Sequence, residues 1–183
     1  ENLQLHAKLY RLPASKQADM IQEALTRFDL LHVADIKPSE VSLGIQQRLQ
    51  LAAACLHQPE VLILDEPTSG VDPVARDMFW QYLMNLSRQD RITIFVSTHF
   101  MNEAQRCDRI SFMDEGKVLA MGSADELKEK AGANNLEDAF IHYLLQAHGQ
   151  KSVLETVHVD EIQELIEETN HAQKGSLRNS ALG

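Results

Sequence analysis

The stretch that decides the fold is VLILDEPTSGVD, residues 61–72. It opens with four apolar residues, Val61 to Leu64, which predict a short strand buried on both faces, as in the middle of a parallel sheet. Asp65 and Glu66 follow at once, so we expect them at the carboxyl end of that strand, where open α/β sheets place their ligands. Adjacent carboxylates there suit Mg²⁺-phosphate chemistry, because one can assist the metal while the other polarises an attacking water.

The residues that follow lead the chain into a helix. Pro67, Ser69 and Gly70 predict a turn, and Asp72-Pro73 predicts a helix start with a capping side chain and a proline in the first turn. This helix is expected to run to about Ser87. Its apolar side is formed by Met78, Phe79, Trp80, Tyr82, Leu83 and Leu86.

A second strand is predicted from Arg91 to Ser97 (RITIFVS), again buried. Thr98 and His99 then occupy the position that the two carboxylates occupy after the first strand. A histidine after a strand is more often structural or exposed than functional. Its equivalent position beside the carboxylate pair nevertheless makes His99 a candidate site residue.

The residues before this stretch predict helices. Residues 1–12 and 15–33 read as two packed helices, and residues 45–57 as a third. The predicted core stripes are Leu5, Leu9 and Leu12 on the first helix, Met20, Ile21, Leu25, Phe28 and Leu31 on the second, and Leu49, Ala52, Ala53 and Leu56 on the third. Ser42 is placed either to cap the third helix or, with the free amides there, to help bind an anion.

The residues after His99 predict a short helix, a hairpin and further helices. The short helix spans 100–106, and the hairpin pairs 109–113 with 117–121. A helix capped by Gly122-Ser123 follows, and then a helix over 136–146. The sequence ends with an acidic amphipathic helix over 159–168 and a linker-like segment. We expect three regions: a helical subdomain (1–58), the second half of a catalytic core with C-terminal helices (59–148), and an acidic helix with a flexible linker (149–183).

Bulk composition narrows the function classes. The 183 residues carry 17 basic and 27 acidic side chains, a net charge of -10, which argues against a broad nucleic-acid surface. Cys55 and Cys107 lie in dissimilar contexts, which favours a reducing compartment. No apolar run is long enough to cross a bilayer, so the chain is expected to be soluble.

The ordered set VSLGIQQRLQLAAACLHQPEVLILDEPTSGVDP followed by STH closely resembles an ATP-binding cassette (ABC) ATPase, from Glu1 to about Gln146. The resemblance implies an α/β fold: part of a P-loop NTPase core with parallel strands, an α-helical signature subdomain and C-terminal helices. Its implied cofactors are ATP and Mg²⁺. The implied partners are a second ATPase domain, in a head-to-tail dimer, and a transmembrane permease domain.

The resemblance also implies roles for individual residues. Ser42 and Gly44 match the signature loop that faces the γ-phosphate of ATP held by the partner domain. Asp65 matches the carboxylate that assists Mg²⁺, and Glu66 matches the general base. The remaining matches are Asp72, in the loop that crosses the dimer interface, and His99, the switch histidine that contacts the γ-phosphate.

Two departures from the family pattern stand out. The signature reads Val-Ser-Leu-Gly-Ile instead of Leu-Ser-Gly-Gly-Gln, so Leu43 is bulky where backbone should approach phosphate and Ile45 removes a polar contact. We expect weakened or asymmetric binding across the interface. The phosphate-binding motif G-x-x-x-x-G-K-[ST] does not occur in the 183 residues, so they read as a fragment that should not bind ATP productively alone.

Three functions remain open at this point. The leading hypothesis is the ATPase part of a drug-export type transporter, at the cytoplasmic face of the cell membrane, which couples ATP-driven closure to a membrane partner. The hairpin and the later GANNLEDAFIHYLLQ segment most resemble this type, and within it the ribosome-associated kind, in which cassette domains precede a membrane region on the same chain. The second is a soluble, ribosome-associated ATPase that transports nothing. The third is a degenerate, non-hydrolysing regulatory half.

Overall fold

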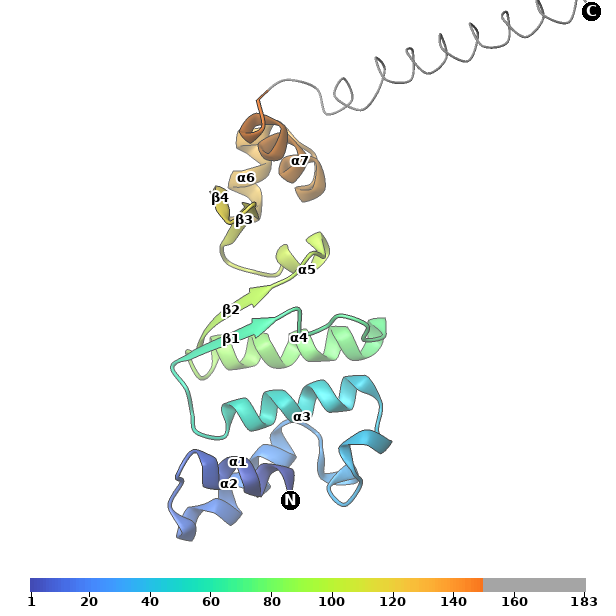
Figure 1. The fold of residues 1–183 in the computed structure, drawn as a ribbon, viewed down its shortest axis with the longest axis vertical. Helices are drawn as coiled ribbons and strands as arrows, with labels where there is room; N and C mark the ends of the chain where they lie inside the picture. The colour runs from blue at the N-terminus through green and yellow to red at the C-terminus, as the bar shows by residue number, and fades with distance from the viewer. Residues whose placement is uncertain (150–183) are drawn as a thin grey trace, which may run out of the picture. The chain divides into compact units, whose positions relative to one another are not determined.

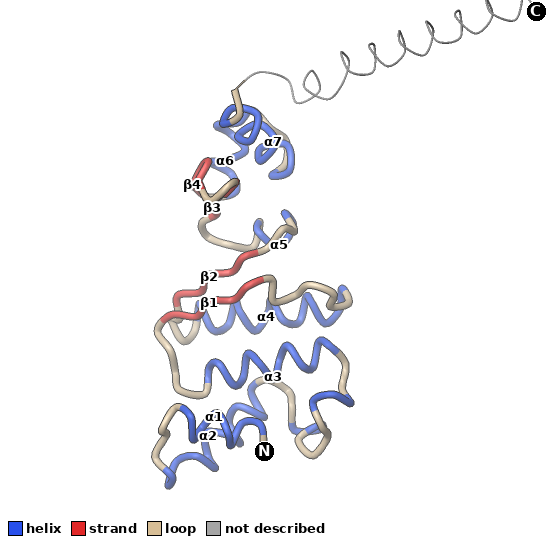
Figure 2. Tube along the Cα trace, in the orientation of Figure 1, coloured by secondary structure: helices blue, strands red, loops and turns tan. Residues whose placement is uncertain are grey.

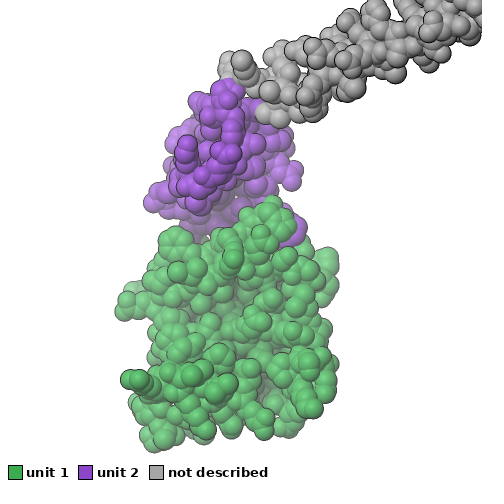
Figure 3. All heavy atoms as spheres, viewed as in Figure 1, with its two compact units in different colours: residues 1–99 green, residues 100–183 purple. Residues whose placement is uncertain are grey.

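The computed structural model describes residues 1–149. The chain divides into two compact units, residues 1–99 and residues from 100 onward, which Figure 3 distinguishes by colour. The acidic helix expected over 159–168 and the linker-like close lie outside the described residues. The boundary expected between residues 58 and 59 stays a prediction.

Helices make up the first half of unit 1 (Figures 1 and 2). They are α1 (Asn2–Leu9), α2 (Ala14–Arg27), the short 3₁₀ turns η1 (Leu31–Val33) and η2 (Pro38–Glu40), and α3 (Leu43–Cys55). α3 contacts α1, α2 and α4. The core between them includes Leu3, Ala7, Ala24, Phe28, Leu30, Leu51, Ala52, Ala53 and Leu56.

The stripe expected on the first helix is wrong. Leu5 is 57% exposed and Leu9 is 65% exposed, whereas Leu3 and Ala7 are buried. Leu3 and Ala7 are one helical turn apart and share a face, and Leu5, two residues on from Leu3, points to nearly the opposite side. The face of α1 that packs into the core is therefore the one with Leu3 and Ala7, and not the one with Leu5 and Leu9.

The expected core position Leu31 is wrong as well. α2 ends at Arg27, and Asp29 then adopts a left-handed conformation with φ 52°. This turn changes the phase of the chain, so that Leu30 is 1% exposed and Leu31 is 48% exposed. The helical periodicity of α2 does not continue past its end.

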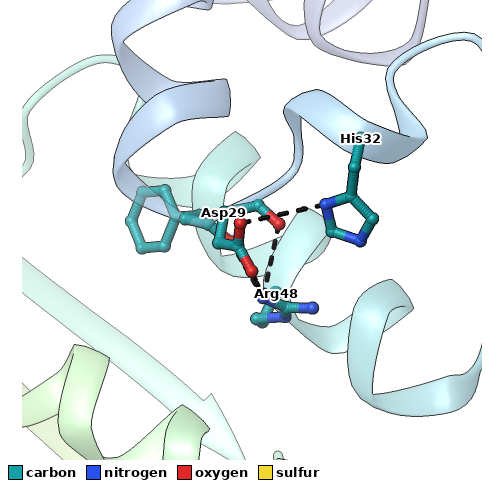
Figure 4. Close-up of polar contacts among 4 residues, drawn as sticks. Asp29, His32 and Arg48 are labelled. Carbon is teal, nitrogen blue, oxygen red and sulfur yellow. Dashed lines mark hydrogen bonds and ion pairs between the residues drawn. The ribbon is translucent and has the colours of Figure 1, made fainter.

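A buried arginine joins α3 to this turn (Figure 4). The Arg48 guanidinium Nη1 donates to the Asp29 carboxylate at 3.1 Å and to the Phe28 and Asp29 carbonyls at 3.3 Å each. His32 Nδ1 lies 3.8 Å from the other carboxylate oxygen of Asp29. Arg48 thereby satisfies carbonyl groups at the end of α2 that have no partner within the helix.

Two parallel strands follow, connected by a helix. They are β1 (Val61–Asp65), α4 (Pro73–Arg88) and β2 (Thr93–Ser97). The strands pair in parallel from Val61 opposite Thr93 to Asp65 opposite Ser97. The expected parallel pair is confirmed, and parallel pairing needs a long crossover such as α4.

The expectation that both faces of these strands are buried is wrong for the described residues. Alternate positions are exposed on one face, with Val61 at 52%, Ile63 at 76% and Phe95 at 64%. α4 contacts β2 and runs beneath both strands in Figure 1, so it covers a single face. The apolar run is continuous in sequence because it supplies residues to both faces of the sheet. Only one of these two faces is covered by other described residues.

Unit 2 is built on a hairpin. Its elements are α5 (Met101–Ala104), β3 (Ile110–Asp114), β4 (Lys117–Gly122), α6 (Ala124–Ala131) and α7 (Leu136–Ala147). Its core consists of Ile110, Phe112, Leu127, Leu136 and Ala139. Among the described residues, no helix is both long and apolar enough to span a membrane.

Local sequence explains the turns of unit 2. Glu115 and Gly116 both have positive φ, 46° and 75°, as a two-residue hairpin turn requires. Ser123 accepts a hydrogen bond from the Glu126 amide, and the Glu126 carboxylate accepts one from the Ser123 amide. The expected hairpin and the expected cap before α6 are both confirmed.

Candidate functional site

The carboxyl ends of β1 and β2 bring polar side chains together. Asp65 and Ser97 are directly opposite in the parallel register. They lie on the exposed face of the sheet, and the Ser97 hydroxyl donates a hydrogen bond to Asp65 Oδ1. This bond uses one of the two carboxylate oxygens.

Glu66, the first residue after β1, has an unusual backbone conformation. Its φ is +42°, in the left-handed region that non-glycine residues rarely adopt. Its N–H donates to the Ser97 carbonyl at 3.0 Å and to Ser97 Oγ at 3.1 Å. The chain therefore turns at Glu66 while its amide stays attached to β2.

The turn places the Glu66 carboxylate beside a histidine. His99 Nδ1 lies 3.2 Å from Glu66 Oε1, and both side chains are about half exposed, at 56% and 49%. The structure thus brings together Asp65, Glu66 and His99, which the sequence placed at equivalent strand ends. Their chemical roles stay predictions.

The other candidate residues lie at the N-termini of α3 and α4. Asp72 caps α4, because its carboxylate accepts from the amides of Val74 at 3.1 Å and Ala75 at 3.0 Å. Ser42 occupies the N-cap position of α3, but its side chain makes no capping hydrogen bond. The cap alone therefore does not account for a serine at position 42.

Gly44 lets α3 and α4 approach each other closely. A Cβ added at Gly44 would lie 2.6 Å from the Ala75 Cβ and 3.7 Å from a Val71 methyl. The first distance is shorter than any normal carbon contact. Gly44 is buried, so its hydrogen side chain serves the packing of α3 on α4.

The unusual Leu43 also has a packing partner. A Cβ added at Gly70 would lie 3.4 Å from Leu43 Cδ2, so this methyl group lies against the loop between Glu66 and Asp72. Gly70 has φ +73°, which a residue with a side chain rarely adopts. The start of α3 is therefore in contact with the loop that leads from the carboxylates to α4.

The side chains at this strand end suit a Mg²⁺ ion that takes only one or two ligands from the protein. Among the described residues, no group of three or more His, Cys, Asp or Glu side chains is arranged to hold a metal ion. Mg²⁺ usually binds through one or two carboxylates together with water and substrate phosphates. Asp65, with a carboxylate at an exposed strand end, has the ligand type and accessibility for this arrangement.

Sequence reasoning missed two residues: Ser97, which lies in the site, and Arg48, which attaches the helix that carries Gly44 to the end of α2. Ser97 is predicted only as part of a strand. The signal that could have found it is its position: Ser97 ends the second predicted strand as Asp65 ends the first, so pairing the two strands end to end places them opposite each other. Arg48 was not singled out, because a charged residue on a helix is usually exposed. The structure shows Arg48 one helical turn after Gly44, where it attaches α3 to the turn that follows α2.

Residues 1–69 match the protein family described as ABC transporter. The chain is 38% identical over 149 residues to the probable multidrug ABC transporter ATP-binding protein YbhF of Escherichia coli (strain K12). That alignment covers 79% of this chain and 26% of the relative, so the chain spans about a quarter of that protein's length.

Solved structures show the same relationship. One, described as the ATP binding subunit of an ABC transporter, has a TM-score of 0.64 at 27% identity, covering 78% of this chain and 60% of its own. Another is a dimeric ATP-binding cassette, MJ0796, in a post-hydrolysis state with ADP and Pi, with a TM-score of 0.54 at 28% identity, covering 61% and 49%. The chain belongs to the ABC transporter family, as part of an ATP-binding cassette ATPase domain.

Proposed function

We propose that the protein containing this chain hydrolyses ATP and that this chain supplies the residues that activate the water. The observation that carries the proposal is the contact between Glu66 and His99 beside Asp65, at the carboxyl ends of two parallel strands. Ligands of open α/β sheets bind at this edge. Phosphoryl transfer needs a positioned water, and Glu66 has the exposure and the oriented carboxylate to hold one.

Each residue then has a defined task. Glu66 accepts a hydrogen bond from the attacking water and takes its proton. His99 holds the Glu66 carboxylate in place and reaches the γ-phosphate. Asp65 assists the binding of Mg²⁺, which when present neutralises charge on the phosphates.

The N-terminus of α3 is proposed to face the nucleotide of a second ATPase domain. Ser42 makes no capping bond, so the first amides of α3 keep donors available for an anion. A related cassette is dimeric with ADP and Pi, which supports a paired arrangement. Leu43 and Ile45 leave the signature less polar than the family pattern, so we propose that it serves a weakened site within an asymmetric pair.

The coupled process is proposed to be export. The named E. coli relative is a probable multidrug transporter component, which supports a transmembrane permease partner and a location at the cytoplasmic face of the membrane. The sequence-based alternative of a ribosome partner gains no support from the fold or from the relatives named above. A regulatory half that does not hydrolyse ATP is the remaining alternative, and it rests on Leu43 and Ile45.

Glu66→Gln in the complete protein tests the proposal. ATP turnover should fall by roughly two to four orders of magnitude, because the amide cannot take the proton of the water, whereas ATP binding measured by calorimetry should persist. Glu60→Gln is the matched control, since Glu60 is an exposed residue that precedes β1. Unchanged turnover in Glu66→Gln would refute the assignment, and a wild-type protein without turnover would favour the regulatory half.

The paired arrangement has its own test. If the signature around Ser42 serves a weakened site, a homodimer of the complete ATPase domain should turn over ATP slowly. Addition of the partner domain should then raise the rate. Full activity from the homodimer would contradict the asymmetric pair and leave the role of Glu66 intact.

A further inference from the structure

We propose that Ser97 is a positioning residue for ATP hydrolysis, which sets Asp65 and Glu66 in one arrangement through a single hydroxyl group. The proposal rests on the proposed function, because positioning has a catalytic meaning only if the two carboxylates act on ATP. Its structural basis is independent of that function. The Ser97 hydroxyl contacts both residues at the end of β1: the side chain of Asp65 and the backbone amide of Glu66.

The hydrogen-bond capacity of the hydroxyl matches these two contacts. A serine hydroxyl has one proton to donate and two lone pairs that accept. The proton goes to Asp65 Oδ1, and a lone pair receives the Glu66 N–H at 3.1 Å. A side chain that only donated or only accepted could not make both bonds.

Strand geometry restricts this role to position 97. Side chains alternate between the faces of a strand, so residues directly opposite in a parallel pair share a face. Ser97 is opposite Asp65, whereas Val96 is opposite Leu64 on the other face. The register of the two strands therefore decides which residue reaches the Asp65 carboxylate.

Ser97 also stabilises the strained residue. A non-glycine residue in the left-handed region is strained and persists only where its surroundings fix it. The Glu66 amide donates to both the carbonyl and the hydroxyl of Ser97. This double attachment holds the turn that presents the Glu66 carboxylate to His99.

The test compares Ser97→Ala with Ser97→Thr in the complete protein. Alanine removes the hydroxyl, and threonine keeps it with a side chain that strands favour. In Ser97→Ala we expect kcat to fall by about 10- to 100-fold, as for the loss of groups that orient metal ligands and bases. Ser97→Thr should stay within about threefold of the wild type, because the orienting hydroxyl is kept.

Nucleotide binding gives a readout separate from turnover. Calorimetry with ATP in EDTA and again with Mg²⁺ measures how much the metal adds to affinity. Ser97→Ala should bind ATP in EDTA as the wild type does, and the gain on adding Mg²⁺ should shrink by about 10-fold, because Asp65 loses its donor. Ser111→Ala is the control, an exposed serine on β3 that lies outside the site.

The possible results separate this proposal from the proposed function. Wild-type kcat and Mg²⁺ dependence in Ser97→Ala would overturn the role of Ser97, and so would an equal loss in Ser97→Thr. If Glu66→Gln keeps its turnover, the proposed function fails instead. Thermal unfolding checks that each variant folds, and Ser97→Cys, which has a similar size and a weaker donor, replaces Ser97→Ala if that variant does not fold.

Discussion

His99 and Glu66 are in contact across the ends of two strands, with Nδ1 of the histidine 3.2 Å from Oε1 of the glutamate. The two residues are brought together by the parallel pairing of β1 with β2. Residues that act as one unit lose most of their effect when either is removed. The contact therefore predicts a particular pattern of mutant rates.

Loss of the histidine and loss of the glutamate should not add. His99→Ala and Glu66→Gln should each lower kcat, and the double variant should be no slower than the slower single one within about threefold. Single-turnover ATP hydrolysis in the complete protein measures this. A double variant whose loss equals the product of the single losses would show that the two side chains act independently.

The two N-cap residues should respond differently to truncation. Asp72→Ala should lower the free energy of unfolding by about 0.5–2 kcal/mol, because Asp72 accepts two helix amides, and Asp72→Asn should restore most of it. Ser42→Ala should leave stability nearly unchanged and lower ATP turnover. Denaturant unfolding with a turnover assay checks both. If Ser42→Ala destabilised the protein as much as Asp72→Ala, Ser42 would be a cap after all.

The contact between Gly44 and Ala75 predicts a compensating pair. Gly44→Ala should lower the free energy of unfolding by about 1–3 kcal/mol through overpacking, despite the higher helix propensity of alanine. Ala75→Gly in the same chain should recover stability, because the added Cβ meets the Ala75 Cβ at 2.6 Å. A double-mutant cycle measured by denaturant unfolding tests the pair. Additive losses would mean that the cost of the added methyl group does not come from its contact with Ala75.

Burial raises the pKa of the Cys55 thiol to about 11, and the nearby Asp90 adds to this while Arg27 opposes it. The folded pKa lies above the ordinary value of 9.0, so the unfolded chain loses its proton first as pH rises. The stabilising contribution is full below pH 9 and is lost as pH rises towards 11. The difference in unfolding free energy between wild type and Cys55→Ala should therefore shrink over this window. A difference that stays constant with pH would contradict the raised pKa.

Local signals in the sequence predicted much of the fold. The strand before Asp65, the cap at Asp72 and the hairpin turn at Glu115-Gly116 depend on residues close together in the chain. All of them are present in the structure. The expected proximity of Glu66 and His99 followed from one further rule, that parallel strands end at the same edge.

The misses have a common physical cause. Periodicity identifies which apolar residues share a face, but the partner that covers the face is a tertiary property. Leu5 and Leu9 fit a helical stripe and are exposed, and Ile63 belongs to an apolar run and is 76% exposed. The roles of Ser97 and Arg48 could not be predicted for the same reason. The role of Ser97 depends on the register of the two strands, and that of Arg48 on the packing of α3 against the end of α2.

The register between β1 and β2 makes the length of a distant turn matter for chemistry. Residues 89–92 connect α4 to β2, and a residue lost there could be absorbed by sliding β2 one place along β1. Such a slip would move every side chain of β2 to the opposite face. Ser97 would then point away from Asp65, so a deletion far from both carboxylates would disable them without changing a single residue of the site.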